Sequence, residues 1–364
     1  MKKLFLFSAA LFLSANIFAL KILIVDNAKK QTIDAAGPFT LTVSNTGKKY
    51  KLKDGGKFTV TQLKNGKIKA GSVTADGEII LKPSANTPLN IAGNAYTGNI
   101  IIEPADKGFK IIEDTDIENY LYGVLPYEMH YTWPAEALKA QAVAARTYTL
   151  RTAQNPKNAD FDLYCDVRDQ MYKGSAIVYP PVKEAVDATR GEVLKYDDKL
   201  FFAYYHANSG GHTDSLPWQS PDGNIKPLQG AAKCYDEGGA GAKWSHTFTS
   251  AEIAAAAGIK GKADAMSITK RASSGRATQL KISTKDGGKR MTCNDFRIAI
   301  GSSKLKSCMI TKIKKTKHGF LFEGKGYSHG SGMSQEGAKA MAEHGKNYKE
   351  ILETFYPGSK LSKL

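Results

Sequence analysis

Alternating apolar and polar residues recur in short runs over the first third of the chain. Four of these runs are rich in β-branched and aromatic residues: residues 20–25, 39–43, 57–60 and 78–81. Turn-forming pairs, Asn65-Gly66 and Asp76-Gly77 among them, separate the runs. Alternation with a period of two is typical of half-buried strands, and such pairs are typical of tight hairpins. The pattern predicts an antiparallel β-rich module over residues 20–112, and this module contains no cluster of catalytic residue types.

Helical periodicity replaces alternation near residue 115. Residues 116–121 have the pattern of a helix start, and a long helix opens at Trp133-Pro134 and runs to about Thr152. Proline suits the first turn of a helix, and Glu136 suits the positive end of the helix dipole. Because the interior of this helix is rich in alanine, neighbouring elements can approach it closely. We expect it to be central and mostly buried.

Strand-like runs return between residues 190 and 325, and helices close the chain. The expected strands lie at residues 192–196, 200–205 and 279–282, and the expected helices at about residues 250–257, 334–343 and 348–355. A glycine-rich loop at residues 324–332 precedes the last two helices. This order of elements predicts an α+β fold, in which residues 113–364 form a mixed α/β region with a β-rich insertion at about residues 214–322.

The N-terminus has the composition of a signal peptide. Met1-Lys2-Lys3 is positive, residues 4–13 are almost wholly apolar, and Ala19 is a small residue at the end of the segment. The apolar run is shorter than the roughly 20 residues that a membrane-spanning helix needs. We therefore expect residues 1–19 to be removed after Ala19 and the protein to be exported, with an uncleaved membrane anchor as the alternative.

The chain is strongly basic, with a formal net charge of +16 that falls to +14 once the two lysines of residues 1–19 are removed. A charge this positive favours polyanionic or acidic surroundings. Export argues against nucleic acid as the partner, so an anionic cell wall or membrane surface fits better. Solubility alone is the less specific interpretation.

The four cysteines are an even number, which permits two disulfides in an exported chain. They are not spaced as a C-x-x-C pair, so a zinc ribbon or a thioredoxin-type site is not expected. We expect Cys293 and Cys308 to lie on adjacent elements and to pair. Cys165 and Cys234 would then form a second bridge.

Glu128 lies between apolar and aromatic neighbours, just before the long helix. A carboxyl group in apolar surroundings has a raised pKa and holds its proton near neutral pH. That is what a general acid needs. A solvated loop glutamate is the alternative interpretation of this segment alone.

Three polar residues interrupt the alanine-rich helix. Lys139 and Arg146 are seven residues apart and share one face, and Gln141 is the third. Buried charges must be paired or hydrogen-bonded. The two cations are therefore candidates for orienting Glu128 or holding a sugar, and the alternative is a structural ion pair with Glu118 or Asp187.

Residues 204–213 follow a predicted strand and combine aromatic, hydroxyl and imidazole side chains, Tyr205, His206 and Ser209 among them. Such groups suit a carbohydrate cleft. Ser209 with His206 also allows a nucleophile and base, but the Gly-x-Ser-x-Gly elbow of many serine hydrolases is absent.

A second polar loop lies at residues 324–338, where five glycines demand unusual backbone angles or close approach. His329 stands where a Gly-x-Gly-x-x-Gly nucleotide loop needs its last glycine, and no Walker lysine follows. We expect His329 and Gln335 to line a cleft, with amides of the following helix as further donors. A tight structural loop is the alternative.

Several motifs, in order along the chain, together resemble the stage II sporulation protein D and amidase-enhancer family. The two longest, residues 118–129 and 133–148, contain Glu128, Lys139 and Arg146. The others are residues 170–174, 188–194, 206–211 and 274–276, and the glycine-rich block with Met333-Ser334-Gln335. The resemblance spans about residues 115–358.

The resemblance implies a lytic transglycosylase that cleaves peptidoglycan glycan strands, especially strands stripped of stem peptides, in the periplasm or the extracellular cell wall. The family's essential glutamate aligns with Glu128, and its helix lysine and arginine align with Lys139 and Arg146. The motif at residues 170–174 adds Tyr172 to the candidates. The candidate set is Glu128 as the catalytic residue, with Lys139, Gln141, Arg146, Tyr172, Tyr205, His206, Ser209, His329 and Gln335 as substrate-binding residues.

A single carboxyl group suffices for this chemistry. Most glycosidases need two carboxylates. In a transglycosylase the C6 hydroxyl of the sugar itself attacks, so we expect Glu128 first to protonate the glycosidic oxygen and then to accept the hydroxyl proton. No cofactor is consumed. The alternative function is a non-catalytic wall-binding protein that stimulates an amidase.

Some family members bind zinc through a cysteine- and histidine-containing segment before the motif at residues 170–174. Here residues 163–169 hold one cysteine, Cys165, and no histidine. The remaining candidate ligands are His206, His212 and His329, but the first two are six residues apart across a glycine pair, which fits no common ligand spacing. We expect no metal.

Overall fold

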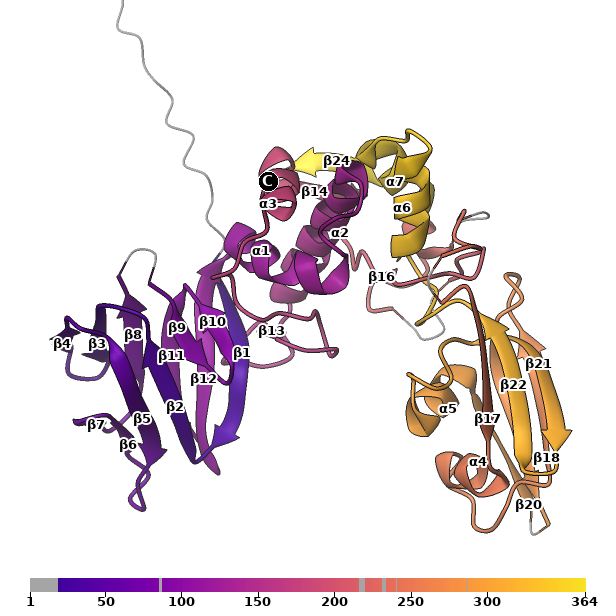
Figure 1. The fold of residues 1–364 in the computed structure, drawn as a ribbon, viewed down its shortest axis with the longest axis horizontal. Coiled ribbons are helices and arrows are strands. Elements are labelled where there is room, and N and C mark those ends of the chain that lie inside the picture. The colour runs from indigo at the N-terminus through magenta and orange to yellow at the C-terminus, as the bar shows by residue number, and fades with distance from the viewer. Residues whose placement is uncertain (1–18, 85–86, 216–219, 231–233, 240, 286) are drawn as a thin grey trace, which may run out of the picture.

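The computed structural model describes residues 19–84, 87–215, 220–230, 234–239, 241–285 and 287–364. Figure 1 shows an arch in which two β-rich modules form the legs and helices form the middle. The expected signal peptide falls on residues 1–18, outside the described residues, except for Ala19, which opens the first strand. None of the described helices combines the length and the apolar composition needed to cross a membrane. Helices together with several sheets confirm the predicted α+β class.

Twelve strands build the N-terminal module: β1 (Ala19–Ala28), β2 (Lys30–Ala35), β3 (Phe39–Val43), β4 (Lys48–Leu52), β5 (Gly56–Gln62), β6 (Ile68–Ala70), β7 (Val73–Ala75), β8 (Ile79–Pro83), β9 (Leu89–Ile91), β10 (Asn94–Tyr96), β11 (Asn99–Ala105) and β12 (Gly108–Asp116). One sheet has the order β1-β12-β11-β8-β3-β4, and the other has the order β10-β9-β2-β5-β6-β7. The alternating pattern places one face of each strand inside: Phe39, Leu41 and Val43 of β3 are buried, and the threonines between them are half-buried. The inner faces share one hydrophobic core.

The middle of the arch contains α1 (Ile117–Glu128), α2 (Ala135–Ala153), α3 (Pro180–Ala188), α6 (Gln335–Glu343) and α7 (Tyr348–Phe355). Helix α2 packs against α1, α3, α6 and α7. Its alanines at 137, 140, 142, 144 and 145 are fully buried, which confirms the expectation of a central helix. Strand β13 (Leu163–Tyr164) pairs with β1 and joins the middle to the N-terminal module. Strands β14 (Glu192–Tyr196), β15 (Lys199–Leu200) and β24 (Lys360–Lys363) form a small sheet beside the helices.

The second β-rich module is inserted between the middle helices. It contains β17 (Lys243–Phe248), α4 (Ser250–Ala256), β18 (Ala265–Arg271), β19 (Ala277–Thr284), β20 (Gly287–Thr292), α5 (Cys293–Ile300), β21 (Met309–Thr316) and β22 (Gly319–Lys325). These strands form two three-stranded sheets, β17-β22-β21 and β18-β19-β20. A separate core of aromatic and aliphatic side chains, with Phe248, Phe296 and Phe322 fully buried, holds the module together.

The strand predicted from the sequence at residues 200–205 is wrong. A continuous strand is expected there, but only Leu200 and Tyr205 lie in strands, at the end of β15 and the start of β16 (Tyr205–His206). The residues between them connect two different sheets, and Phe201 and Ala203 are buried in the core around α2. Tertiary packing, not a backbone ladder, therefore explains their apolar character. Helices α3 and α5, of nine and eight residues, are absent from the expected elements.

The four cysteines carry free thiols in this structure. Cys293 and Cys308 lie in the same core and their thiols hydrogen-bond, so the expected pair is close together but not bridged. The expected bridge between Cys165 and Cys234 is wrong. Cys165 packs beside the N-terminal core, whereas Cys234 is buried in the core around α2.

Arg146 of α2 forms hydrogen bonds with both α1 and β14. Its guanidinium donates two hydrogen bonds to Glu118 of α1, Nε to Oε1 at 3.1 Å and Nη2 to Oε2 at 2.7 Å. It also donates to the carbonyl of Glu192 at 3.0 Å. Glu118 in turn accepts the amide of Gly191 at 3.1 Å. Because both side chains are buried, this pair fixes α1, α2 and the start of β14 relative to one another.

We expect mild oxidation of the folded protein to join Cys293 to Cys308 and to leave Cys165 and Cys234 as thiols. Peptide mass spectrometry without reduction tests this, with Cys308→Ser as the control that should give no bridge. A peptide that links Cys165 to Cys234 would contradict the structure.

Arg146→Met should lower the free energy of unfolding by about 3–5 kcal/mol, because it leaves the Glu118 carboxylate buried without a partner. Thermal unfolding measures the loss. The double variant Arg146→Met with Glu118→Leu removes both charges and should recover most of the stability. A double variant as unstable as Arg146→Met alone would show that the pair is not the source of the loss.

Candidate active site

Glu128 is the last residue of α1 and receives donors from two distant segments. The amide of Met171 donates to Glu128 Oε1 at 3.0 Å. The side chain of Gln335, at the start of α6, donates a second hydrogen bond to the carboxylate. Glu128 itself is half-buried. Segments more than 150 residues apart in the sequence therefore meet at one carboxyl group.

Burial raises the pKa of Glu128 above its usual range, because loss of water disfavours the carboxylate. The Met171 amide and the Gln335 side chain act in the opposite direction, since they stabilise the charged form, but burial has the larger effect. No carboxylate is among the described groups that shift this pKa. The group therefore holds its proton to higher pH and still has two donors for its anion, which suits an acid that later acts as a base.

A layer of amide and phenol groups lies behind Glu128. Gln335 Nε2 lies 3.4 Å from Gln141 Oε1, and Gln141 Nε2 is buried without a hydrogen-bond partner among the described residues. Gln170 donates to the Tyr205 hydroxyl at 2.9 Å and accepts from Thr149 Oγ1 at 2.6 Å. Burial, and then the charge of Glu128, raise the pKa of Tyr205. The structure thus brings Gln141, Tyr205 and Gln335 to Glu128, as expected for side chains of one site.

Two short parallel strands join the two polar loops. Tyr205 and His206 of β16 pair with Met333 and Ser334 of β23 (Met333–Ser334), and α6 begins directly after β23. The close approach needs a glycine at position 332, where φ is +69° and a Cβ would lie 1.8 Å from the Tyr204 carbonyl oxygen. This pairing is what carries Gln335 to Glu128.

His206 and His329 form a second, buried group, with ring centroids 5.4 Å apart. Burial and neighbouring positive charge lower the pKa of His329 to about 3 and that of His206 well below its usual value, so both rings are neutral. His206 Nδ1 bonds to the Ser331 carbonyl at 3.0 Å, and Ser209 Oγ accepts the Gly211 amide at 3.1 Å. Serine and histidine therefore do not make the contact that a nucleophile and its base require.

Asp236 organises this group and does not appear among the sequence candidates. Its carboxylate accepts the amides of Ser209 at 2.5 Å and Gly211 at 2.8 Å, and the hydroxyl of Ser334 at 2.5 Å. It therefore holds the loop after β16 against the start of α6. An isolated aspartate in a loop carries no signal of this role in the sequence. Gln170 and Met171, by contrast, lie inside a motif identified from the sequence. Met171 contributes its backbone amide and Gln170 a buried side-chain amide, and neither role can be read from the residue type.

Three sequence candidates lie away from Glu128. Arg146 is fully buried in its pair with Glu118, which is the structural alternative considered for it. Lys139 pairs with Glu136 at 2.7 Å on the side of α2 that faces α7. Tyr172 is buried and donates to Glu113 Oε2 at 2.6 Å, and burial raises the pKa of Glu113 to about 7. Each of these three side chains therefore has a polar partner within the fold other than Glu128.

Among the described residues, no group of three histidines, cysteines, aspartates or glutamates is placed to hold a metal ion. His212 bonds through Nδ1 to the Thr213 carbonyl at 2.5 Å, apart from the contact between His206 and His329.

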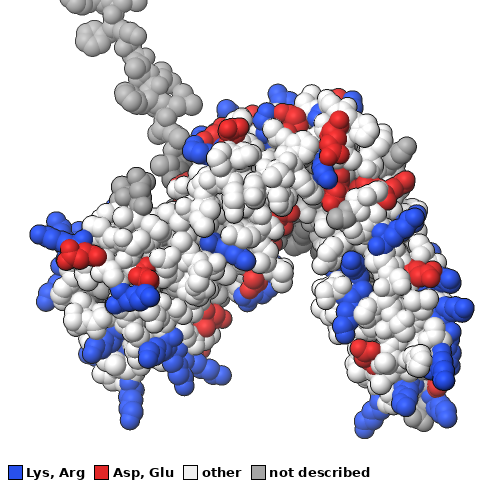
Figure 2. Space-filling view, in the orientation of Figure 1, with Lys and Arg blue, Asp and Glu red and all other residues white. Residues whose placement is uncertain are grey.

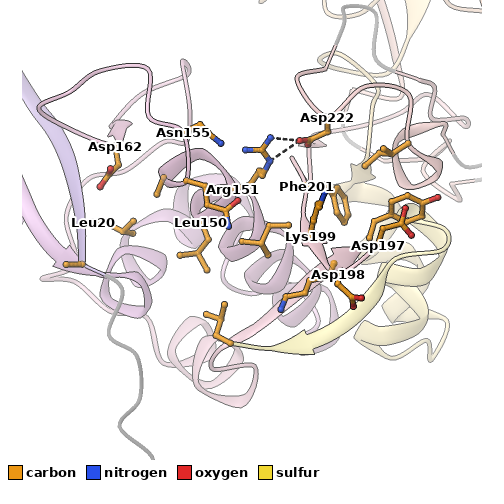
Figure 3. A pocket seen from close by; sticks show the side chains of 18 residues that line it. Leu20, Leu150, Arg151, Asn155, Asp162, Asp197, Asp198, Lys199, Phe201 and Asp222 are labelled. Atoms are coloured by element: carbon orange, nitrogen blue, oxygen red, sulfur yellow. Dashed lines mark hydrogen bonds and ion pairs between the residues drawn. The ribbon is translucent and has the colours of Figure 1, made fainter.

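A hollow of about 860 Å³ lies near the C-terminal end of α2, and Figure 3 shows the side chains that line it. Arg151 donates from Nε and Nη2 to Asp222 Oδ1 at 2.9 and 2.7 Å beside this hollow. None of the candidate site residues lines it. We therefore assign the candidate chemistry to the surroundings of Glu128 and not to this hollow.

Comparisons with known proteins match two regions of the chain. The family model described as "Stage II sporulation protein" matches residues 105–196, which include Glu128, and a domain of unknown function matches residues 235–332. An uncharacterised protein of Brachyspira hyodysenteriae is 33% identical over 343 residues, which cover 90% of each chain.

Relatives with functional names match as well. The amidase enhancer of Bacillus subtilis is 29% identical over 86% of this chain, and the match covers 51% of the enhancer, so this chain spans about half of its length. Stage II sporulation protein D of Bacillus subtilis is 28% identical over 69% of this chain and 76% of its own. The chain described here belongs to the stage II sporulation protein D and amidase-enhancer family.

Proposed function

We propose that the protein is a peptidoglycan lytic transglycosylase that cleaves glycan strands, preferably strands stripped of peptide, and leaves 1,6-anhydro ends. The observation that carries the proposal is Glu128, a half-buried carboxyl group with a raised pKa, two hydrogen-bond donors and no described carboxylate among the groups that shift its pKa. Membership of the family supports a role at the cell wall.

In this mechanism Glu128 starts protonated and gives its proton to the oxygen of the breaking glycosidic bond. The C6 hydroxyl of the same sugar attacks its C1 carbon, and the Glu128 carboxylate accepts the hydroxyl proton. The glycosidic bond breaks, the anhydro ring forms, and Glu128 regains its proton without net consumption of water. Met171 and Gln335 stabilise the carboxylate in the interval between the two proton transfers.

Side chains around Glu128 are suited to holding a sugar. Tyr205 is half-buried, lies close enough to Glu128 for its charge to raise the Tyr205 pKa, and offers an aromatic ring to a sugar. We propose that the reaction takes place after export, in the periplasm or the extracellular wall, because the proposed substrate lies there and residues 1–19 have the composition of a signal peptide.

A second function is enhancement of a cell-wall amidase without cleavage, and the likeness to the amidase enhancer favours it. The two functions differ in their products. Purified protein on stripped glycan yields 1,6-anhydro ends only in the first case.

Glu128→Gln keeps the shape of the side chain but removes the proton, so the rate of anhydro-end formation should fall by about 10²–10⁴-fold. Mass spectrometry of the released fragments measures it, and binding to intact strands should persist. Glu184→Gln makes the same chemical change at an exposed position of α3 and should leave the rate unchanged. Full activity in Glu128→Gln would refute the mechanism.

Gln335→Met should move the alkaline limb of the pH–rate profile upward. The Gln335 side chain lowers the pKa of Glu128, so its removal raises that pKa, and the acid stays protonated to higher pH. The dependence of kcat/KM on pH tests this, with the same chemical change at the exposed Gln229, Gln229→Met, as the control that leaves the surroundings of Glu128 unchanged. A limb that stays or moves to lower pH in Gln335→Met would show that Glu128 is not the group that titrates.

A further inference from the structure

The positive charge of the chain is concentrated in the inserted module. Residues 243–325 contain eighteen lysines and arginines against five aspartates and glutamates, a formal net charge of +13 out of +16 for the whole chain. In Figure 2 lysine and arginine side chains outnumber acidic ones on the corresponding leg of the arch. Charge on this scale attracts polyanions, and its location shows which part of the molecule meets them.

The sheet β18-β19-β20 has one buried and one exposed face. Leu280 and Ile282 of β19 are fully buried and point into the core of the module. The alternate positions therefore face outward. Across the three strands they form the rows Ala265-Ser283-Gly288, Ser267-Lys281-Arg290 and Lys270-Gln279-Thr292. Among these nine described residues, three are cations, the others are small or polar, and none is a carboxylate.

Lys281 and Arg290 are direct cross-strand partners. Like charges in this position destabilise a sheet. Both side chains are exposed, and among the described residues neither lies within 4.0 Å of a carboxylate in an ion pair. The arrangement therefore disfavours the fold locally, while an anion bound from outside would remove the repulsion.

The same face continues into a shallow groove of about 520 Å³ at the β19–β20 hairpin. The groove is lined by Lys281, Ser283, Thr284, Lys285, Gly287, Gly288, Lys289 and Arg290. Its donors are ammonium, guanidinium and hydroxyl groups, which suit a ligand that carries both carboxylates and hydroxyls.

We propose that this outward face, defined by Lys270, Lys281 and Arg290, binds glycan strands from which the stem peptides have been removed. Hydrolysis of the amide bond to a stem peptide leaves a free lactyl carboxylate on the sugar. A stripped strand is therefore a linear polymer with carboxylates at regular intervals close to its backbone. The identity of the polymer rests on the function proposed above, whereas the cationic face itself does not.

Two features favour a glycan over an anionic membrane or a phosphodiester polymer. The outward rows carry hydroxyl and amide side chains for sugar hydroxyls and no large apolar side chain for insertion into lipid. In addition, β22 of this module leads within the next ten residues to Gln335, whose side chain bonds to Glu128. A glycan strand bound to the module is therefore held by the same part of the protein that leads to Glu128.

Binding is measured with the full-length Glu128→Gln protein, so that strands stay intact. Lys270→Gln, Lys281→Gln and Arg290→Gln together should weaken the Kd for stripped glycan about tenfold or more, and should reduce its dependence on salt. The matched control changes Lys48, Lys49 and Lys51 to Gln on the exposed strand β4, which removes the same charge from the other leg and should leave the Kd unchanged. The unfolding temperature of the triple variant should not fall, since the change relieves repulsion.

A second arm changes the ligand. Stripped strands whose lactyl carboxylates are converted to neutral amides should bind the parent protein as weakly as normal strands bind the triple variant. Equal binding of amidated and normal strands would overturn the proposal. So would a triple variant that keeps its affinity for stripped glycan but loses affinity for vesicles of anionic lipid or for a phosphodiester polymer.

The two proposals fail in different ways. Wild-type protein that produces no anhydro ends refutes the transglycosylase function, whatever the binding results. Wild-type protein that cleaves, together with a triple variant that binds stripped glycan as tightly as its parent, refutes the cationic face alone.

Discussion

The ion pair between Arg146 and Glu118 is the constraint on which the arrangement of the middle helices depends. Neither charge is solvated, so each needs the other, and the remaining hydrogen bonds of the pair go to the backbone at the start of β14. Because Glu118 lies in the first turn of α1 and Glu128 ends the helix, the same pair helps set the position of the candidate acid. An arginine remote from the substrate can therefore be indispensable to the site through placement alone.

Opposed effects set the properties of Glu128. Burial favours its protonated form, and hydrogen bonds from Met171 and Gln335 favour its carboxylate. With burial alone the group would be a poor base, and with the donors alone it would be a poor acid near neutral pH. In the proposed mechanism, both effects on one side chain allow a single carboxyl group to serve both proton transfers. Glycosidases with two carboxylates divide these tasks between two environments.

The inserted module combines a stable core with an outward face whose charges repel one another. Its core is well packed around buried aromatic residues, yet its outward sheet face places like charges opposite each other. A stable core tolerates such local repulsion because exposed charges interact weakly across water. The chain runs from β22 of the module to α6 of the helical middle, so the proposed binding face and the proposed acid are joined by one short segment.

Local patterns in the sequence determined most of the elements. Alternation located β3, alanine content identified α2 as central, and the apolar setting of Glu128 indicated a raised pKa, because each depends on neighbours in the chain. Contacts between distant segments were decided only by the tertiary structure. Lys139 and Arg146 share a helical spacing, yet one pairs with Glu136 and the other with Glu118, away from Glu128. Asp236 and the Met171 amide entered the site without any local signal, since hydrogen bonds across more than forty residues follow from packing and not from sequence spacing.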